Sequence, residues 1–154
     1  MNKIKTKAEI EEISKDLIQK NKKIVTCNGC FDILHIGHIK FLKEAKKQGD
    51  VLIIGLNSDS SVKQNKGPER PINNEDDRAE VLAALEMVDY ITIFNETTPL
   101  NLLETIKPDI HCNGEEYGEN CIESEIIKKY GGKIHLIKLK KGYSTTDIIQ
   151  KLNK

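Results

Sequence analysis

The sequence lacks an excess of charge of either sign. It has 154 residues, with 24 Lys and Arg against 24 Asp and Glu, so the formal net charge is zero. Its lysine pairs, at 22–23, 46–47, 128–129 and 140–141, are spread along the chain rather than gathered in one block. Because a nucleic-acid-binding protein normally carries a basic excess, we expect no nucleic-acid partner.

Long apolar runs and a secretory signal are also missing. Uninterrupted apolar runs, such as VLII at 51–54, are far shorter than the roughly 20 residues that a membrane-spanning helix needs. The opening stretch, MNKIKTKAEIEEISKDL, is charged throughout, unlike the apolar segment of a secretory signal. We therefore expect a cytoplasmic protein with no membrane partner.

The sequence lacks a second C-x-x-C pair, so its cysteines give little support for a metal site. Of the four cysteines, Cys27 and Cys30 form a C-x-x-C pair that the other two do not repeat. A structural zinc site needs a second pair of ligands. His35 and His38 could supply one, but the intervening FDIL favours apolar packing. We expect reduced thiols and no bound metal, with a zinc site as the alternative.

The hydrophobic pattern alternates between helical and strand periods. Ile10, Ile13 and Leu17 recur at spacings of three and four, which predicts an amphipathic helix. The same criteria predict strands at 22–28, 50–57, 89–94, 108–113 and 133–139, and helices at 7–20, 37–49, 74–88, 98–107, 122–132 and 144–152. This alternation predicts an α/β fold, a Rossmann-like doubly wound parallel sheet of five strands with helices on both faces. No Pro-, Gly- or Ser-rich linker interrupts it, so we expect one domain over residues 1–154, with its first helix within residues 1–20.

One motif lies where the first predicted strand of the sheet gives way to a helix. The segment NGCFDILHIGH ends in H-x-G-H, formed by His35, Gly37 and His38. Ligands of open parallel sheets bind beyond the carboxyl ends of the strands, and the start of a helix favours phosphate. The three-residue spacing lets both imidazoles face one side of the first turn, and Gly37 has no Cβ to block a ligand. We predict that the two histidines stabilise a reacting phosphoryl group; the alternative is a pair of polar residues satisfied within a turn.

GCFDILHIGH resembles the signature of the H-x-G-H nucleotidyltransferase superfamily. It also contains the HIGH of class I aminoacyl-tRNA synthetases, but the chain is short and has GYSTTDII rather than a K-M-S-K-S-like loop. Together with LNSDSSV, KGPERPIN, DDRAEVLAALEMVDYITIF, TTPL and STTDII, the motif resembles the heptose 1-phosphate adenylyltransferase (ADP-heptose synthase) family. Glycerol 3-phosphate and ethanolamine-phosphate cytidylyltransferases are similar over most of this skeleton.

The resemblance implies transfer of a nucleoside monophosphate from a nucleoside triphosphate to a sugar or polyol phosphate, with release of pyrophosphate. ATP and heptose 1-phosphate are the implied pair. The alternative is CTP with glycerol 3-phosphate, phosphoethanolamine or a similar small phosphate, and a distant one is a non-catalytic nucleotide-binding module. The resemblance also implies Mg²⁺ carried on the triphosphate and a homodimer, which relatives commonly form.

The resemblance assigns roles to individual residues. His35 and His38 would stabilise the α-phosphate in the transition state, while Lys66, from a flexible loop, and Arg78 would bind phosphates. Taken alone, Lys66 could be a solvated lysine and Arg78 a surface ion pair. The remaining nucleotide-binding residues that the resemblance implies are Cys30, Phe31, Asp32, Gly37, Asn57, Asp59, Gly114, Glu115, Ser144, Thr145 and Thr146.

Two departures from the family patterns leave the base and the acceptor open. Where heptose enzymes typically have K-G-G-D-Y, this chain has NGEEY at 113–117, with Asn113 replacing a lysine and Glu115 a glycine. Small cytidylyltransferases favour R-T-x-G-I-S-T-T near the end, whereas this chain has LKKGYSTT, with Leu139 at the arginine position.

Overall fold

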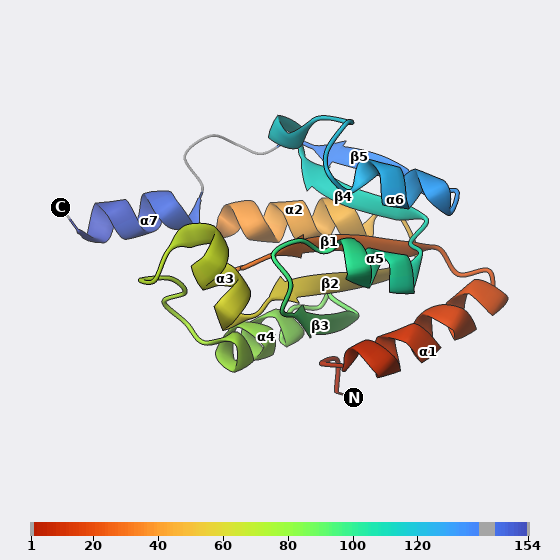
Figure 1. Cartoon of the computed structure of the whole chain (residues 1–154), viewed down its shortest axis with the longest axis horizontal. Coiled ribbons are helices and arrows are strands. Elements are labelled where there is room, and N and C mark those ends of the chain that lie inside the picture. Colours follow the sequence, from red (N-terminus) through yellow and green to blue (C-terminus); the bar gives the residue numbers. More distant parts are fainter. Residues whose placement is uncertain (1, 139–143, 154) are drawn as a thin grey trace.

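The computed structural model describes residues 2–138 and 144–153. Its centre is a five-stranded sheet of order β3-β2-β1-β4-β5, and every pairing in it is parallel (Figure 1). The strands are β1 (Ile24–Gly29), β2 (Val51–Asn57), β3 (Tyr90–Phe94), β4 (Ile110–Gly114) and β5 (Lys133–Ile137). The strand order reverses at β1, between β2 and β4, so the predicted doubly wound parallel sheet is confirmed.

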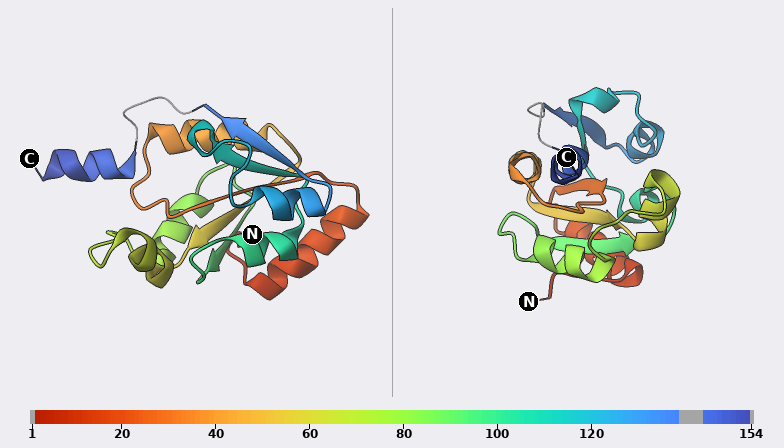
Figure 2. Two further views of the ribbon diagram at one scale, coloured as in Figure 1. Left: turned by 45° about the horizontal axis from the view of Figure 1, so that its top comes forward. Right: turned by 90° about the vertical axis from the view of Figure 1, so that its left-hand side faces the viewer.

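Helices cover both faces of the sheet (Figure 2). One face carries α1 (Lys7–Gln19), α5 (Leu100–Ile106) and α6 (Ser124–Lys129), and the other carries α2 (Ile36–Lys46) and α4 (Glu75–Ala83). The carboxyl end of the sheet is flanked by α3 (Asp59–Lys66), the 3₁₀ turn η1 (Glu115–Tyr117) and α7 (Thr145–Leu152). In the described part of the chain, no helix is both long and apolar enough to cross a membrane.

The pleat of the central strands separates two apolar cores. Leu52 and Ile54 pack on the side of α2 and α4, where they join Leu42 of α2. Ile53, between them, points to the opposite side and packs with Ile10 of α1. Because both faces of β2 are buried, the strand is apolar at nearly every position, as in other parallel sheets covered on both sides.

The sequence pattern did not predict helix α3. Ser58 caps this helix by accepting a hydrogen bond of 3.2 Å from the backbone N–H of Ser61. Only Ser61 and Val62 of the helix are buried, so the sequence has almost no apolar stripe from which this helix could be predicted. Gly67, with φ of 100°, follows directly and ends it. Lys66 is therefore the last residue of a helix, which corrects its expected place in a flexible loop.

Candidate active site

A cavity of about 270 Å³ opens at the carboxyl end of the sheet, where the order of strands reverses. We call it the histidine cavity. Asn28 and Gly29 reach it from the end of β1, and Asn113 and Gly114 from the end of β4. The starts of α2 and α7, the end of α3 and the turn η1 also contribute to its wall. Ligands of doubly wound sheets bind at this position.

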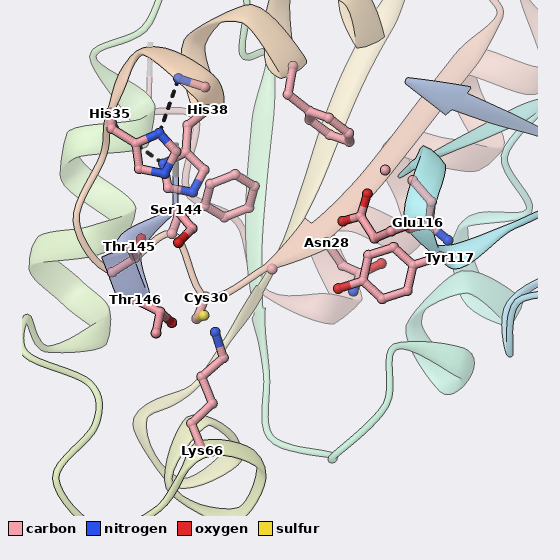
Figure 3. A pocket seen from close by; sticks show the side chains of 16 residues that line it. Asn28, Cys30, His35, His38, Lys66, Glu116, Tyr117, Ser144, Thr145 and Thr146 are labelled. Atoms are coloured by element: carbon pink, nitrogen blue, oxygen red, sulfur yellow. Dashed lines mark hydrogen bonds between the residues drawn. The ribbon is translucent and has the colours of Figure 1, made fainter. Parts of the chain in front are cut away.

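His35 and His38 face each other at the start of α2 (Figure 3). Their ring centroids are 3.8 Å apart and their planes lie 27° from parallel, so the rings stack. His35 is the N-cap residue, and its Nδ1 accepts a hydrogen bond of 3.1 Å from the backbone N–H of Gly37. In return, Nδ1 of His38 accepts from the backbone N–H of His35 at 3.3 Å. The pair thus forms a capping box made of imidazoles.

These capping bonds fix which ring nitrogen carries the proton. An Nδ1 that accepts a backbone N–H cannot hold a proton itself, so each neutral ring carries its proton on Nε2. Nε2 of His35 is buried and has no hydrogen-bond partner within the described residues. Both rings line the histidine cavity. The pair therefore offers Nε2–H donors to a ligand there.

The environment keeps both imidazoles neutral. Burial is the main cause that lowers the pKa of His38 from its ordinary 6.5 to about 4, and the charges that His35 and Lys66 carry when protonated contribute to the same shift. Burial also lowers the pKa of His35, although the Asp147 carboxylate works in the opposite direction. The ring of Phe31, 5.3 Å from that of His38 between centroids, contributes to this apolar surrounding. Near neutral pH the two rings are therefore hydrogen-bond donors without a net charge.

We expect the low pKa of His38 to make the folded state sensitive to mild acid. Between about 6.5 and about 4, the unfolded chain binds a proton at this residue and the folded chain does not. The free energy of unfolding should therefore be unaffected by His38 above pH 6.5 and should fall as the pH drops through that window. Urea unfolding at a series of pH values measures the effect. His38→Gln removes this titrating ring and should make the profile shallower, while His35 and His111, whose pKa values are also lowered, keep part of the slope; an identical profile in this variant would contradict the assignment.

Lys66 supplies the positive charge at the lower rim of the histidine cavity. Its side chain rises from the end of α3 towards Cys30 (Figure 3). The positive charge of Lys66 also lowers the pKa of His38, so Lys66 contributes to the electrostatic potential at the histidine pair. A cation beside two uncharged donors suits an anionic ligand such as a phosphate chain.

The start of α7 forms a second phosphate-compatible wall. Ser144, Thr145 and Thr146 line the histidine cavity on the same side as the histidines (Figure 3). The Ser144 hydroxyl caps α7 by accepting from the backbone N–H of Asp147 at 3.0 Å. The Thr145 hydroxyl donates to the carbonyl of Ile33 at 3.1 Å and so ties α7 to the loop after β1. Leu139, the other position singled out near this end of the chain, lies outside the described residues.

The wall opposite the histidines contains residues that sequence reasoning missed. Asn28, Glu116 and Tyr117 face the histidine cavity from β1 and η1 (Figure 3). Gly114 lies beside them as expected, but Glu115 is exposed and does not line the cavity. The 3₁₀ turn that follows β4 decides which of the two neighbouring glutamates turns inward. The NGEEY motif alone gave no sign of that choice.

Arg78 has a structural position that differs from the expected phosphate contact. Its side chain is fully buried and does not line the histidine cavity. Four hydrogen bonds of 2.7–2.9 Å occupy it, to the carbonyls of Asn73, Cys30 and Asn57 and to the carboxylate of Asp59. We therefore correct the assignment of Arg78 and Asp59, which join the loops after β1 and β2 to α4 rather than contact phosphate. Asn57 takes part in the same network, because its backbone carbonyl accepts a hydrogen bond from Arg78.

Asp32 also holds the loop after β1 in place. Its buried carboxylate accepts hydrogen bonds from the backbone N–H groups of Ile72 and Asn73, at 2.8 and 2.9 Å, and from Arg70 Nε at 3.1 Å. Burial by itself raises the pKa of Asp32, but these donors outweigh it and hold the pKa below its ordinary value. Asp32 therefore fixes the loop that carries Phe31 and His35, and it does not line the histidine cavity.

The structure does not bring together the cysteines and histidines of the alternative zinc site. Cys27 is buried in the apolar core between β1 and α2, whereas Cys30 borders the histidine cavity. Burial raises the pKa of Cys27, and it raises that of Cys112 to about 12, so both thiols stay protonated. Within residues 2–138 and 144–153, no group of three or more His, Cys, Asp or Glu side chains could hold a metal ion.

Comparisons with known proteins agree with this geometry. The model of the cytidylyltransferase-like family matches residues 26–151. The bifunctional protein HldE of a Nitratiruptor species is 52% identical over 150 residues, which are 97% of this chain and 32% of that protein. The bifunctional protein HldE of Aliarcobacter butzleri is 51% identical over 150 residues, 97% of this chain and 31% of that protein. The chain thus spans about a third of the length of these curated relatives.

Two solved structures share the fold. The lipopolysaccharide core biosynthesis protein from Thermoplasma volcanium has a TM-score of 0.63 and 33% identity, over 80% of this chain and 99% of that one. The pantoate-beta-alanine ligase from Francisella tularensis has a TM-score of 0.62 over 97% of this chain and 76% of that one. At 20% identity, the second likeness shows the fold alone.

Proposed function

The chain belongs to the cytidylyltransferase-like family of nucleotidyltransferases, and we propose that it transfers AMP from ATP to heptose 1-phosphate, giving ADP-heptose and pyrophosphate. The observation that carries this proposal is the pair of Nε2–H donors in the histidine cavity, at the switch point of the sheet. The heptose acceptor rests on the sequence resemblance and on the HldE relatives.

The proposed reaction is a single in-line displacement. An oxygen of the acceptor phosphate attacks the α-phosphorus of the triphosphate and forms the new P–O bond. The bond from the α-phosphorus to the oxygen that bridges it to the β-phosphorus breaks, and pyrophosphate leaves with that electron pair. Such reactions depend on positioning and on stabilising the charge that spreads over the phosphoryl oxygens. Mg²⁺ bound to the triphosphate would neutralise part of its negative charge, and few protein ligands would be needed to hold it.

The histidine pair acts on the α-phosphate. The Nε2–H groups of His35 and His38 donate to its non-bridging oxygens, which gain negative charge as the fifth P–O bond forms. The backbone has already satisfied both Nδ1 atoms, so the rings need not reorient during the reaction. The positive end of the α2 dipole points at the same place.

Lys66 binds the phosphate chain of the nucleotide. We expect Lys66→Ala to raise the KM for ATP about tenfold, because a charge-assisted hydrogen bond is worth about 1.5–3 kcal/mol. The effect on kcat should be smaller than on KM. Lys63→Ala is the matched control, since Lys63 lies on the same helix, is exposed and lines no cavity wall described here. Steady-state kinetics measure both, and an unchanged KM in Lys66→Ala would leave it as a surface lysine.

A pyrophosphate-release screen tests the proposed function. The purified chain is combined with each of four nucleoside triphosphates and with heptose 1-phosphate, glycerol 3-phosphate or phosphoethanolamine. We expect the highest kcat/KM for ATP with heptose 1-phosphate. A preference for CTP with either small phosphate would replace the proposal with the cytidylyltransferase alternative. No release with any pair would contradict nucleotidyl transfer by this chain.

A further inference from the structure

A second cavity, of about 450 Å³, lies beside the histidine cavity at the same edge of the sheet. We call it the adjoining cavity. The two share wall residues, among them Asn28, Cys30, Lys66 and Asn113. The rest of the adjoining cavity is formed mainly by α3, by residues 97–99 before α5 and by residues 122–123 before α6. A ligand there would lie next to a nucleotide in the histidine cavity, and Lys66 would stand between them.

Glu123 brings a buried carboxyl group to the adjoining cavity. The residue is only 6% exposed, yet it forms no ion pair with any described residue. The hydrogen bond that its carboxylate accepts from the Asn113 amide is long, at 3.3 Å. The neighbouring His111 ring and Cys121 thiol are neutral, since burial lowers the pKa of the ring and raises the pKa of the thiol. Glu123 therefore retains capacity to accept hydrogen bonds.

Asn28 adds a second free acceptor on the same wall. Its Oδ1 is buried and has no hydrogen-bond partner in the described part of the chain. A buried acceptor left unpaired is costly, so a ligand that donates a hydrogen bond to it binds more tightly. Asn28 and Glu123 both line the adjoining cavity, and both can accept hydrogen bonds from donor groups of a ligand. Lys66 has the opposite requirement, because its positively charged ammonium group favours an anionic ligand.

We propose that Glu123, held by Asn113, recognises hydroxyl groups of the acceptor in the adjoining cavity while Lys66 attracts the acceptor phosphate. This inference rests on the proposed function and adds the residues that would select its acceptor, a polyhydroxylated phosphate with no other charged group. Hydroxyl groups donate to a carboxylate and to an amide oxygen, whereas a second anionic group would be repelled by Glu123. A cavity of about 450 Å³ has room for a ligand with several hydroxyls.

Glu123→Gln tests the role of the carboxylate. The variant keeps the shape of the side chain and removes its charge. We expect the KM for heptose 1-phosphate to rise about tenfold, as for loss of one charge-assisted hydrogen bond, with the KM for ATP unchanged. Glu125→Gln, an exposed glutamate on α6, is the matched control and should leave both constants unchanged. Equal KM values for the acceptor in Glu123→Gln and wild type would overturn the inference and leave the proposed function standing.

Acceptor analogues on the wild-type protein give a readout that does not depend on the variant folding. Removing single hydroxyls from the sugar phosphate should lower kcat/KM about tenfold for at least one position, and Glu123→Gln should lose most of that discrimination. If no missing hydroxyl matters to the wild type, the inference fails. If phosphoethanolamine is preferred, Glu123 recognises an ammonium group and the inference also fails. If no acceptor releases pyrophosphate, the proposed function itself has failed.

Discussion

His38→Ala should lower kcat by about two to three orders of magnitude, the loss that follows removal of one transition-state hydrogen-bond donor. In the folded protein the His38 ring is neutral, stacks on His35 and lines the cavity where the α-phosphate is proposed to react. The KM for ATP should change much less, since the donor acts on charge that develops only as the new bond forms. Steady-state kinetics with both substrates varied separate the two effects.

His38→Gln is the control for structural damage. Glutamine is a natural N3 residue of a capping box, so its side-chain oxygen can replace Nδ1 as acceptor for the His35 backbone N–H. We expect this variant to fold with nearly normal stability and still to lose most of its turnover, because no imidazole Nε2–H remains at that place. Near-normal turnover in His38→Ala would reject His38 as a donor to the reacting phosphate, since glutamine but not alanine has N–H donors of its own.

Arg78→Ala should destabilise the fold by about 3–5 kcal/mol, the range for removing one partner from a buried charged network. The substitution leaves the Asp59 carboxylate without its cation, and it leaves the carbonyls of Cys30 and Asn57 without their donor. Arg78→Lys should rescue little, because an ammonium cannot reach four acceptors with the planar geometry of a guanidinium. Urea unfolding at neutral pH measures the loss.

Lys20→Ala offers a matched surface comparison. Lys20 pairs with Asp16 at 2.8 Å, but its side chain is 63% exposed, so its removal should change the free energy of unfolding little. If Arg78→Ala were as stable as Lys20→Ala and instead raised the KM for ATP, the phosphate-binding role implied by the sequence resemblance would be restored.

The fold was predictable because its signals are local. Apolar residues at strand spacing, bounded by helical periods, located all five strands to within a few residues; the strand expected at 133–139, for example, spans Lys133–Ile137. Helix ends were less predictable. The helix expected at 122–132 is confined to Ser124–Lys129, since Glu123 turns into a cavity wall and Gly131 has a positive φ of 82°. Helix α3 was missed because polar capping rather than an apolar stripe defines it.

The site was predictable where residues are close in sequence, and not where remote segments meet. The spacing of His35 and His38 indicated a shared side of one turn, and the structure places both in one cavity. Arg78 was misread because buried arginines are uncommon and its four acceptors come from three separate segments. Glu123 gave no signal at all, since its importance depends on its contact with Asn113 of β4 and on its forming no ion pair with any described residue.

Two-dimensional ¹H–¹⁵N spectra of the histidine rings, recorded at neutral pH with and without a non-hydrolysable ATP analogue, test the central claim most directly. The account predicts that His35 and His38 are neutral with the proton on Nε2, and that the analogue shifts their Nε2 resonances while their Nδ1 resonances move little. Protons on Nδ1, or Nε2 resonances that do not respond to the analogue at saturation, would contradict it.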